Sequence, residues 1–339
     1  MTISKKIKSE YIFLENITVR KEILDRISQI DTLVFDVDGV LVDVRKSFRK
    51  AISQTVQFYF KEVLHFTGTP NIISPEEIDY FKMAGGFNND WDLTSAVILF
   101  YLMKAKTDNL KNTDELRNSE PNIKVFTTKI LPKGGGLAKV IELIEKDRVA
   151  KEIIFSRWDK DLITKIFQEI YAGKEYCINV YGFHPSLIET EGLIKQEEII
   201  IDKEKKEILQ YYSIGILTGR NKGEAKIALE RLDWSAIILD DQIITAGDGL
   251  AKPHTQGLKR LFINLKTKLG IYIGDTRDDL MVVKNFNKEE KEIKFLSSIV
   301  LAEKCDFQNE AGEFYLREGV DILAKDVNCV LDLLAQVKK

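Results

Sequence analysis

The chain has 339 residues, enough for one large domain or two domains of ordinary size. Apolar residues make up 44% and charged residues 30%, a mixture that can bury a core and that excludes a disordered or fibrous chain. The formal net charge of −3 supplies no positive field of the kind that nucleic-acid binding needs, so we expect no nucleic-acid partner.

Three features indicate a cytoplasmic protein. The longest apolar run, residues 95–103, is far shorter than the roughly 20 residues of a membrane span, so we expect no membrane partner. The N-terminal residues include lysines with no apolar block behind them, which predicts that there is no signal peptide. The three cysteines, Cys177, Cys305 and Cys329, are too few for a disulfide framework and indicate reduced thiols.

The first predicted strand leads into an acidic loop. Residues 1–30 form a charged lead-in, and the apolar spacing of residues 19–30 predicts a helix. The apolar run Thr32–Phe35 then predicts a buried strand, which ends abruptly in Asp36-Val-Asp38-Gly39. A buried strand followed by such a loop is a common way for an α/β sheet to present reactive groups at its carboxyl edge.

Residues 44–205 show a mainly helical pattern. Apolar residues recur on one face of residues 47–64, which predicts an amphipathic helix. Further helices are predicted over residues 76–83, 90–104, 137–144 and 161–171. The polar stretch 107–124, rich in Asn, Asp and Ser, predicts a long exposed loop.

Strands and helices alternate from residue 211 onward. Strands are predicted at 213–217, 236–239, 270–273 and 298–301, and helices at 222–232, 255–265, 279–286 and 327–337. Such alternation predicts an α/β fold in which helices cover both faces of a parallel sheet. We therefore expect an α/β core formed by residues 1–46 and 207–339, split by a helical domain of residues 47–206 inserted after the first core strand.

Polar clusters follow four of the predicted core elements. They are Asp36–Asp43, Thr218-Gly219-Arg220, Ala251-Lys252-Pro253 and Asp275–Asp279. The carboxyl ends of parallel strands meet at one edge of a sheet, so these clusters are expected to line one crevice. Three carboxylates from two strands suit Mg²⁺, which prefers oxygen ligands, and a lysine, a threonine hydroxyl and turn N–H groups suit a phosphoryl group. A carboxylate can also act as the nucleophile, so the inventory predicts phosphoryl transfer.

The four clusters, in this order, resemble the four motifs of the haloacid dehalogenase superfamily. The resemblance covers residues 30–43 and 207–339, and the inserted domain is similar to the helical cap of the phosphoglycolate phosphatase-like branch, although it is longer. The resemblance implies a Rossmann-like core, a cap that sets substrate specificity, and Mg²⁺ as cofactor. It also implies hydrolysis of a small phosphorylated metabolite through an aspartyl-phosphate intermediate.

The resemblance also implies roles for individual residues. Asp36 would be the nucleophile, and Asp38 would protonate the leaving oxygen and then activate the water. Asp36, the Asp38 carbonyl and Asp275 would hold the metal, with Asp279, favoured over Asp278 by its spacing, in a supporting place. The residues implied to bind the substrate phosphate are Gly39, Thr218, Gly219 and Lys252.

Five further residues are candidates for substrate specificity: Arg45, Asn88, Asn89, Trp91 and Arg220. Arg220 has two interpretations, binding a second anionic group of the substrate or pairing with a nearby acid. The segment Gly85–Asp92 also has two, a loop that reaches the substrate or a glycine turn followed by a helix cap and a core tryptophan.

Three alternatives to a phosphatase stay open at this point. A phosphomutase of the same branch would share every core motif. A dehalogenase would share Asp36 but would have no use for Mg²⁺ or for Asp38 as an acid and base, and a non-catalytic module would be expected to lose the catalytic carboxylates. The leaving group is open among phosphoglycolate, sugar phosphates, nucleotides and amino-alcohol phosphates such as histidinol phosphate, and a homodimer is also left open.

Overall fold

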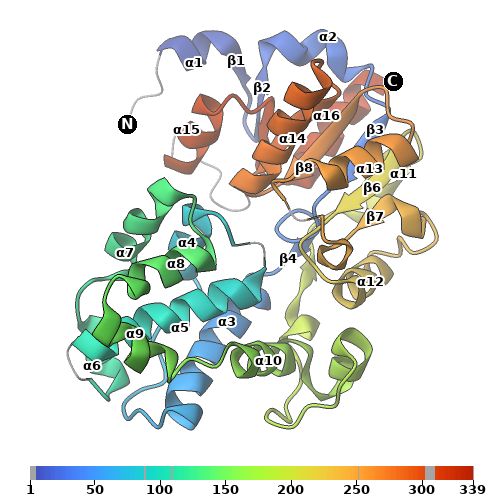
Figure 1. Cartoon of the computed structure of the whole chain (residues 1–339). Coiled ribbons are helices and arrows are strands. Elements are labelled where there is room, and N and C mark those ends of the chain that lie inside the picture. The colour runs from blue at the N-terminus through green and yellow to red at the C-terminus, as the bar shows by residue number, and fades with distance from the viewer. Residues whose placement is uncertain (1–4, 88, 108–109, 251, 302–309, 339) are drawn as a thin grey trace. The chain divides into compact units, whose positions relative to one another are not determined.

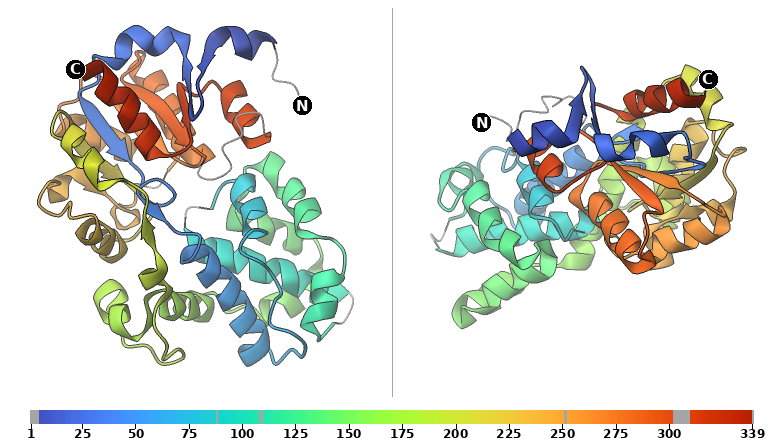
Figure 2. Two further views of the ribbon diagram at one scale, coloured as in Figure 1. Left: turned by 180° about the vertical axis from the view of Figure 1, so that it is seen from behind. Right: turned by 90° about the horizontal axis from the view of Figure 1, so that it is seen from above.

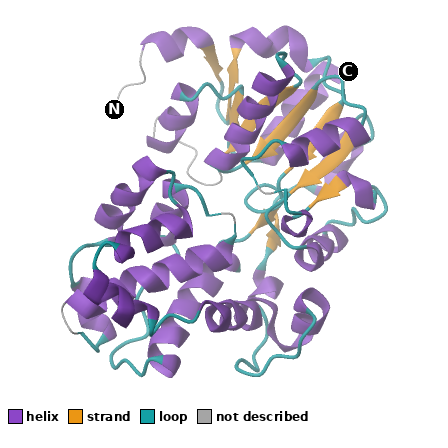
Figure 3. Cartoon of the chain, viewed as in Figure 1, coloured by secondary structure: helices purple, strands orange, loops and turns teal. Residues whose placement is uncertain are grey.

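The computed structural model describes residues 5–87, 89–107, 110–250, 252–301 and 310–338. The chain divides into two compact units, one formed by Met1–Asp43 with Glu198–Lys339 and the other by Val44–Glu197. The sheet belongs to the first unit, and the second unit is helical (Figures 1 and 3). The domain limits predicted from the sequence, 46/47 and 206/207, lie three and nine residues further along the chain than the limits of these units, 43/44 and 197/198.

An eight-stranded sheet forms the frame of the first unit, with strand order β1-β2-β10-β9-β8-β3-β6-β7. The strands are β1 (Tyr11–Phe13), β2 (Ile17–Arg20), β3 (Thr32–Phe35), β6 (Ser213–Leu217), β7 (Ile243–Ile244), β8 (Gly270–Gly274), β9 (Phe295–Val300) and β10 (Ile322–Ala324). From β10 to β7 the strands run parallel, whereas β1 and β2 add an antiparallel edge. The predicted parallel α/β sheet is confirmed.

Strand β3 lies at the point where the direction of strand order reverses. Phe35, its last residue, pairs with Ile216 of β6 on one side and with Ile273 of β8 on the other. The carboxyl ends of these three strands are therefore neighbours. An open α/β sheet binds its ligands at such a switch point, which places the expected site here.

Helices cover both faces of this sheet. They are α1 (Lys5–Glu10), α2 (Leu24–Ile27), α11 (Lys206–Leu209), α12 (Lys222–Arg231), α13 (Gln256–Asn264), α14 (Arg277–Glu290), α15 (Glu310–Arg317) and α16 (Val327–Lys338). Leu258 of α13 and Phe286 of α14 pack in one buried cluster with Val34, Tyr272 and Phe295 of the sheet. Helices α11 and α16 lie on the opposite face, as the views from the front and from behind show (Figures 1 and 2).

The outgoing and returning segments of the chain are tied together beside β3. Strand β4 (Val42–Asp43) pairs antiparallel with β5 (Glu198–Ile199). The Ile200 N–H extends the ladder by donating to the Leu41 carbonyl at 2.9 Å. Both segments therefore belong to the sheet-containing unit, and the helical unit begins and ends beyond them.

The second unit is a helical assembly built around one buried helix, α5. Its helices are α3 (Phe48–Phe58), α4 (Ile78–Ala84), α5 (Asp90–Thr107), α6 (Thr113–Asn118), α7 (Ile123–Ile130), α8 (Gly136–Glu145), α9 (Arg148–Phe155) and α10 (Lys160–Tyr181). Helices α3, α8, α9 and α10 all pack against α5, whose residues 96–102 are buried. Within the described part of the chain, no helix combines the length and the apolar character that crossing a membrane requires.

Two glycine segments of the second unit pack backbone against backbone. A Cβ placed on Gly86 would lie 2.4 Å from the Gly134 carbonyl oxygen, and a Cβ on Gly135 would lie 2.0 Å from that of Gly85. All three of Gly85, Gly86 and Gly135 have positive φ, so glycine is favoured by conformation as well as by space. The contact joins the end of α4 to the start of α8.

Of two predictions of local structure, one is wrong and the other is correct only in part. Residues 107–124 are not a long loop, since α6 and the start of α7 lie in this stretch. Asn112 and Asn122 cap these helices by accepting backbone N–H groups, which is the physical reason why Asn is frequent there. The helix predicted at residues 19–30 is shorter than expected: β2 ends at Arg20, and a 3₁₀ turn at Lys21–Ile23 leads directly into the four-residue helix α2.

The predicted strand at 236–239 is also wrong. These residues form a turn after α12, with Ile237 and Leu239 exposed, and the strand is instead β7, at Ile243–Ile244. An apolar run is a weak strand signal when it is this short. Of the cysteines, Cys177 and Cys329 are free thiols, and Cys305 lies outside the described residues.

Candidate active site

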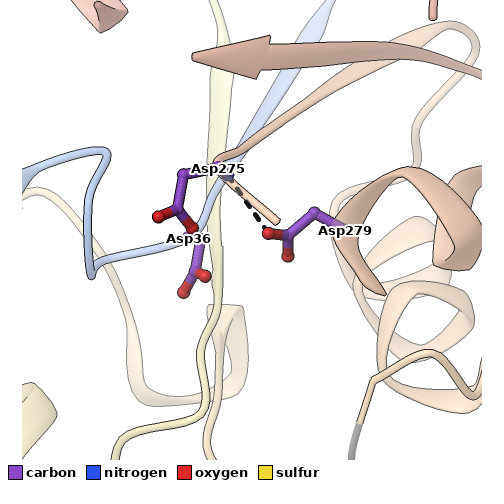
Figure 4. A group of neighbouring side chains, drawn as sticks. All are labelled: Asp36, Asp275 and Asp279. Atoms are coloured by element: carbon purple, nitrogen blue, oxygen red, sulfur yellow. Dashed lines mark hydrogen bonds between the residues drawn. The ribbon is translucent and has the colours of Figure 1, made fainter. Parts of the chain in front are cut away.

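Three aspartates converge at the switch point of the sheet. Asp36 follows β3, Asp275 follows β8, and Asp279 lies in the first turn of α14 (Figure 4). One carboxylate oxygen from each of the three lies within 4.8 Å of the others. Carboxylate oxygens at this spacing form a donor set for a hard cation such as Mg²⁺.

The loop after Asp36 lies directly against Asp275. Gly39 has a φ of +73°, and a Cβ at this position would lie 2.2 Å from Asp275 Oδ2. The Gly39 N–H donates to the Val42 carbonyl at 2.9 Å, which closes the loop. Only glycine therefore fits between this turn and the carboxylate.

Lys252 bridges two of these carboxylates. Its Nζ donates to Asp36 Oδ2 and to Asp279 Oδ1, each at 2.6 Å. Burial alone would lower the pKa of Lys252, but the charges of Asp279 and Asp36 raise it well above its ordinary value, so the ammonium stays charged. Burial raises the pKa of Asp36 to about 6, against the opposing effect of Lys252.

Asp279 organises the loop that follows β8. Its Oδ1 accepts from Tyr272 Oη at 2.9 Å in addition to Lys252, and its Oδ2 accepts the N–H groups of Asp275 and Thr276 and the Thr276 hydroxyl. Burial would raise the pKa of Asp279, but Lys252 and the Thr276 hydrogen bonds shift it below the ordinary value. It is Asp279, and not Asp278, that belongs to the aspartate group.

Asp38 is paired with a buried arginine. Arg220 Nε donates to Asp38 Oδ1 at 2.7 Å, and the Arg220 side chain is 0% exposed whereas that of Asp38 is 26% exposed. Of the two interpretations of Arg220, the structure shows the pairing with an acid. Arg220 therefore has no exposed group to offer to a second anion of a substrate.

The loop after β6 holds the candidate phosphate-binding threonine. Thr218 is buried, and its hydroxyl accepts the Arg220 N–H at 3.2 Å. The Thr218 N–H donates to the Ile244 carbonyl, and the Gly39 N–H is occupied by Val42, so neither of these amides is free for a phosphate. Gly219 is exposed, and its amide has no hydrogen-bond partner within the described residues. The expected phosphate contact through the Gly39 amide is therefore not supported, whereas Gly219 stays a candidate.

The remaining candidates lie in the helical unit. Arg45 is half-buried in the turn before α3. Asn89 caps α5, because its Oδ1 accepts the Asp92 N–H at 2.7 Å while its amide donates to the Asp92 carboxylate. The Trp91 ring packs edge-on against Tyr181, and Asn88 lies outside the described residues. These contacts match a helix cap and a packed tryptophan, and a specificity role for this segment stays a prediction.

Two tyrosines of the site were not identified from the sequence. Tyr272 of β8 contacts both Asp279 and the Leu217 carbonyl, at 2.9 and 3.2 Å. Tyr315 of α15 donates to the Asp275 carbonyl at 3.4 Å. Tyr272 lies inside a predicted strand and not in one of the polar clusters, and α15 was not predicted, so only the three-dimensional arrangement revealed either residue.

Comparisons with known proteins agree on one fold. A model of the haloacid dehalogenase-like hydrolase family matches residues 30–287. The structure of phosphatase Tt82 from Thermococcus thioreducens is 24% identical, covers 85% of this chain and 99% of its own, and superposes with a TM-score of 0.54. A structure solved by the Northeast Structural Genomics Consortium is 18% identical, covers 91% of this chain and 100% of its own, and superposes with a TM-score of 0.56.

A curated relative matches a shorter stretch. An imidazoleglycerol-phosphate dehydratase from Phytophthora nicotianae is 36% identical over 72 residues. The match covers 21% of this chain and only 14% of the dehydratase. It indicates kinship over a segment and does not transfer the activity of the whole relative.

Proposed function

The chain belongs to the haloacid dehalogenase-like hydrolase family, and on this premise we propose that it is a Mg²⁺-dependent phosphatase acting on a small phosphate monoester. The observation that carries the proposal is the bridge from Lys252 to Asp36 and Asp279 beside Asp275. A nucleophilic carboxylate, a fixed cation and a metal-binding donor set then occupy one switch point. These are the groups that phosphoryl transfer needs.

The residues present fit a magnesium ion. The donors are all carboxylate oxygens, as Mg²⁺ prefers. The loop at Gly39 lies so close to the Asp275 carboxylate that any side chain at position 39 would collide with it. In the proposal Asp36, Asp275 and the Asp38 carbonyl hold the ion, and Asp279 supports it indirectly, since its oxygens already accept five hydrogen bonds. When bound, Mg²⁺ would shield the negative charge of the phosphoryl oxygens.

In the first step a carboxylate oxygen of Asp36 attacks the phosphorus atom. The bond from phosphorus to the leaving oxygen breaks, and Asp38 gives its proton to that oxygen. Lys252 and Thr218 stabilise the charge on the remaining phosphoryl oxygens. The Lys252 ammonium is suited to this role because its pKa lies well above its ordinary value.

In the second step water hydrolyses the aspartyl-phosphate. The Asp38 carboxylate takes a proton from the water as its oxygen bonds to phosphorus, and the bond from phosphorus to Asp36 breaks. Phosphate leaves and Asp36 is restored. In the proposal the helical unit selects the leaving group, with Arg45, Asn89 and Trp91 as candidates, while the cytoplasmic location and a homodimer stay predictions.

The test is phosphate release from a panel of phosphorylated metabolites, with Mg²⁺ and with chelator, by wild type and Asp36→Asn. The panel includes sugar phosphates, phosphoglycolate, nucleotides and histidinol phosphate. Imidazoleglycerol phosphate is added because the curated relative is named for it, and a 2-haloacid tests dehalogenation. We expect Mg²⁺-dependent release that Asp36→Asn abolishes and that the matched variant Asp278→Asn retains. Release that survives in Asp36→Asn would contradict the proposal.

A further inference from the structure

Arg220 is a fully buried charge in the sheet-containing unit. Its side chain is 0% exposed, and a guanidinium taken out of water is tolerated only when it is paired and hydrogen-bonded. Asp38 is an ion-pair partner of Arg220, through a 2.7 Å contact from Nε to Oδ1. At this distance the contact is a charge-assisted hydrogen bond, which is stronger than a neutral one.

We propose that Arg220 is a positioning residue that holds Asp38 in place for proton transfer, an inference that rests on the proposed function. The hydrogen bond engages Oδ1 of Asp38, and the carboxylate has no further hydrogen bond within the described residues. Oδ2 is therefore available to the leaving oxygen and then to the attacking water. Arg220 acts through Asp38 and does not touch the substrate.

The position of Arg220 is itself set by the sheet. Its N–H donates to the Thr218 hydroxyl at 3.2 Å, and its carbonyl accepts the Ala246 N–H at 2.9 Å. Nη1 of its guanidinium reaches the Glu224 carbonyl in the first turn of α12 at 3.4 Å. These contacts tie Arg220 to the segments that directly follow β6 and β7 and to α12, whereas Asp38 lies in a loop. A rigid partner that orients a loop side chain provides the preorganisation that catalysis requires.

The turn Thr218-Gly219-Arg220 links the acid–base residue Asp38 to the proposed phosphate-binding residue Thr218. The Thr218 hydroxyl oxygen accepts the Arg220 N–H, so the hydroxyl proton is directed away from that bond and can be donated to a phosphoryl oxygen. In the proposal the Thr218 side chain binds the phosphate, while the side chain of Arg220, two residues later, binds the proton donor Asp38. Thr218-Gly219-Arg220 serves both halves of the reaction.

The test is a double-mutant cycle on the full-length protein. Arg220→Met removes the charge at similar volume, Asp38→Asn removes the proton-transfer group, and the third variant carries both changes. With the best substrate of the panel, we expect Arg220→Met to lower kcat by at least about tenfold with KM changed less than about twofold. In the Asp38→Asn background the same change is expected to cost less than about twofold, because its target is already absent.

Two further variants separate positioning from folding. Arg220→Lys keeps a positive charge and is expected to retain more kcat than Arg220→Met, and it replaces that variant if Arg220→Met does not fold. Asn221→Ala removes the side chain that caps α12 and leaves the pair intact, so it is expected to lower the thermal unfolding temperature with kcat unchanged.

Each outcome of the cycle decides the inference. Wild-type kcat in Arg220→Met would overturn it, and so would independent effects that multiply in the double variant. A wild-type protein that releases no phosphate would overturn the proposed function and this inference together. An active wild type with an equally active Arg220→Met would overturn the inference alone.

Discussion

Lys252 Nζ lies 2.6 Å from Asp36 Oδ2, although 216 residues separate the two in the chain. The contact joins the loop after β7 to the end of β3 and places a cation against the proposed nucleophile. Because the same ammonium also contacts Asp279, it compensates two buried negative charges at once.

Replacing Lys252 is expected to abolish most of the activity. Lys252→Met leaves the two carboxylates without their shared cation and removes a charge from the phosphoryl group, so kcat should fall by about 10²–10³-fold. Phosphate release measures the effect. Lys259→Met, at an exposed lysine of α13, is the matched control, and comparable loss in both variants would argue against a specific role.

Gly39→Ala is expected to weaken magnesium binding. The added methyl group would meet Asp275 Oδ2 at 2.2 Å in a backbone with φ of +73°, so the carboxylate must move. We expect the Kd for Mg²⁺ to rise at least about tenfold, as losses at metal-supporting positions commonly do, when measured by titration calorimetry.

The control for Gly39→Ala is Gly249→Ala. Gly249 has a similar φ of +69° but nothing within 4 Å of an added Cβ. The Gly249→Ala variant therefore has the backbone strain of a positive φ without a collision between the new methyl group and a neighbouring atom. Magnesium affinity that drops equally in both variants would show that strain, and not the contact with Asp275, is responsible.

Tyr272→Phe is expected to lower both stability and activity. It removes the hydroxyl that contacts Asp279 and the Leu217 carbonyl, which leaves a buried acceptor unsatisfied and costs about 1–3 kcal/mol. Asp279 then holds Lys252 less firmly, so kcat should also fall, by a few fold. Chemical denaturation and phosphate release measure the two effects.

A matched tyrosine separates these effects. Tyr101→Phe removes a hydroxyl that donates to the Ile72 carbonyl at 2.8 Å inside the helical unit. We expect a stability loss of similar size without a loss of kcat. An unchanged kcat in Tyr272→Phe would show that its hydroxyl serves folding only.

Gly135→Ala is expected to destabilise the helical unit. The new methyl group would lie 2.0 Å from the Gly85 carbonyl oxygen, which has no room to yield because it belongs to backbone. Gly134→Ala has the same kind of positive φ with nothing within 4 Å, so it reports the strain alone. Strain of this kind costs about 1–3 kcal/mol, and Gly135→Ala should exceed the cost of Gly134→Ala by at least about 1 kcal/mol in thermal unfolding. Equal losses of stability in the two variants would contradict a collision between the new methyl group at position 135 and the Gly85 backbone.

The family and the main elements were readable from local patterns. Thr32–Phe35 and Ser213–Leu217 are buried strands at the predicted residues, and the acidic run at Asp36 lies where a strand ends. Strand and helix periodicity act over a few residues, so they survive in a sequence read alone. The helices within residues 107–124 were not predicted because they are short, so their periodicity is weak. Asn112 and Asn122 cap these helices, and the residues that pack against them lie elsewhere in the chain.

By itself, the sequence determined that Asp36 and Asp275 follow strands of an α/β sheet and that Lys252 and Asp279 lie close to the starts of helices, because these patterns are local. Only the tertiary structure decided which residues are partners. Arg220 pairs with Asp38, Tyr272 contacts Asp279, and the segment Gly85-Gly86 packs against Gly134–Gly136. Such pairs form between residues far apart in the chain, and which pairs form depends on strand order and on the direction of each side chain. Neither property leaves a periodic signal, so these contacts become visible only when the chain is folded.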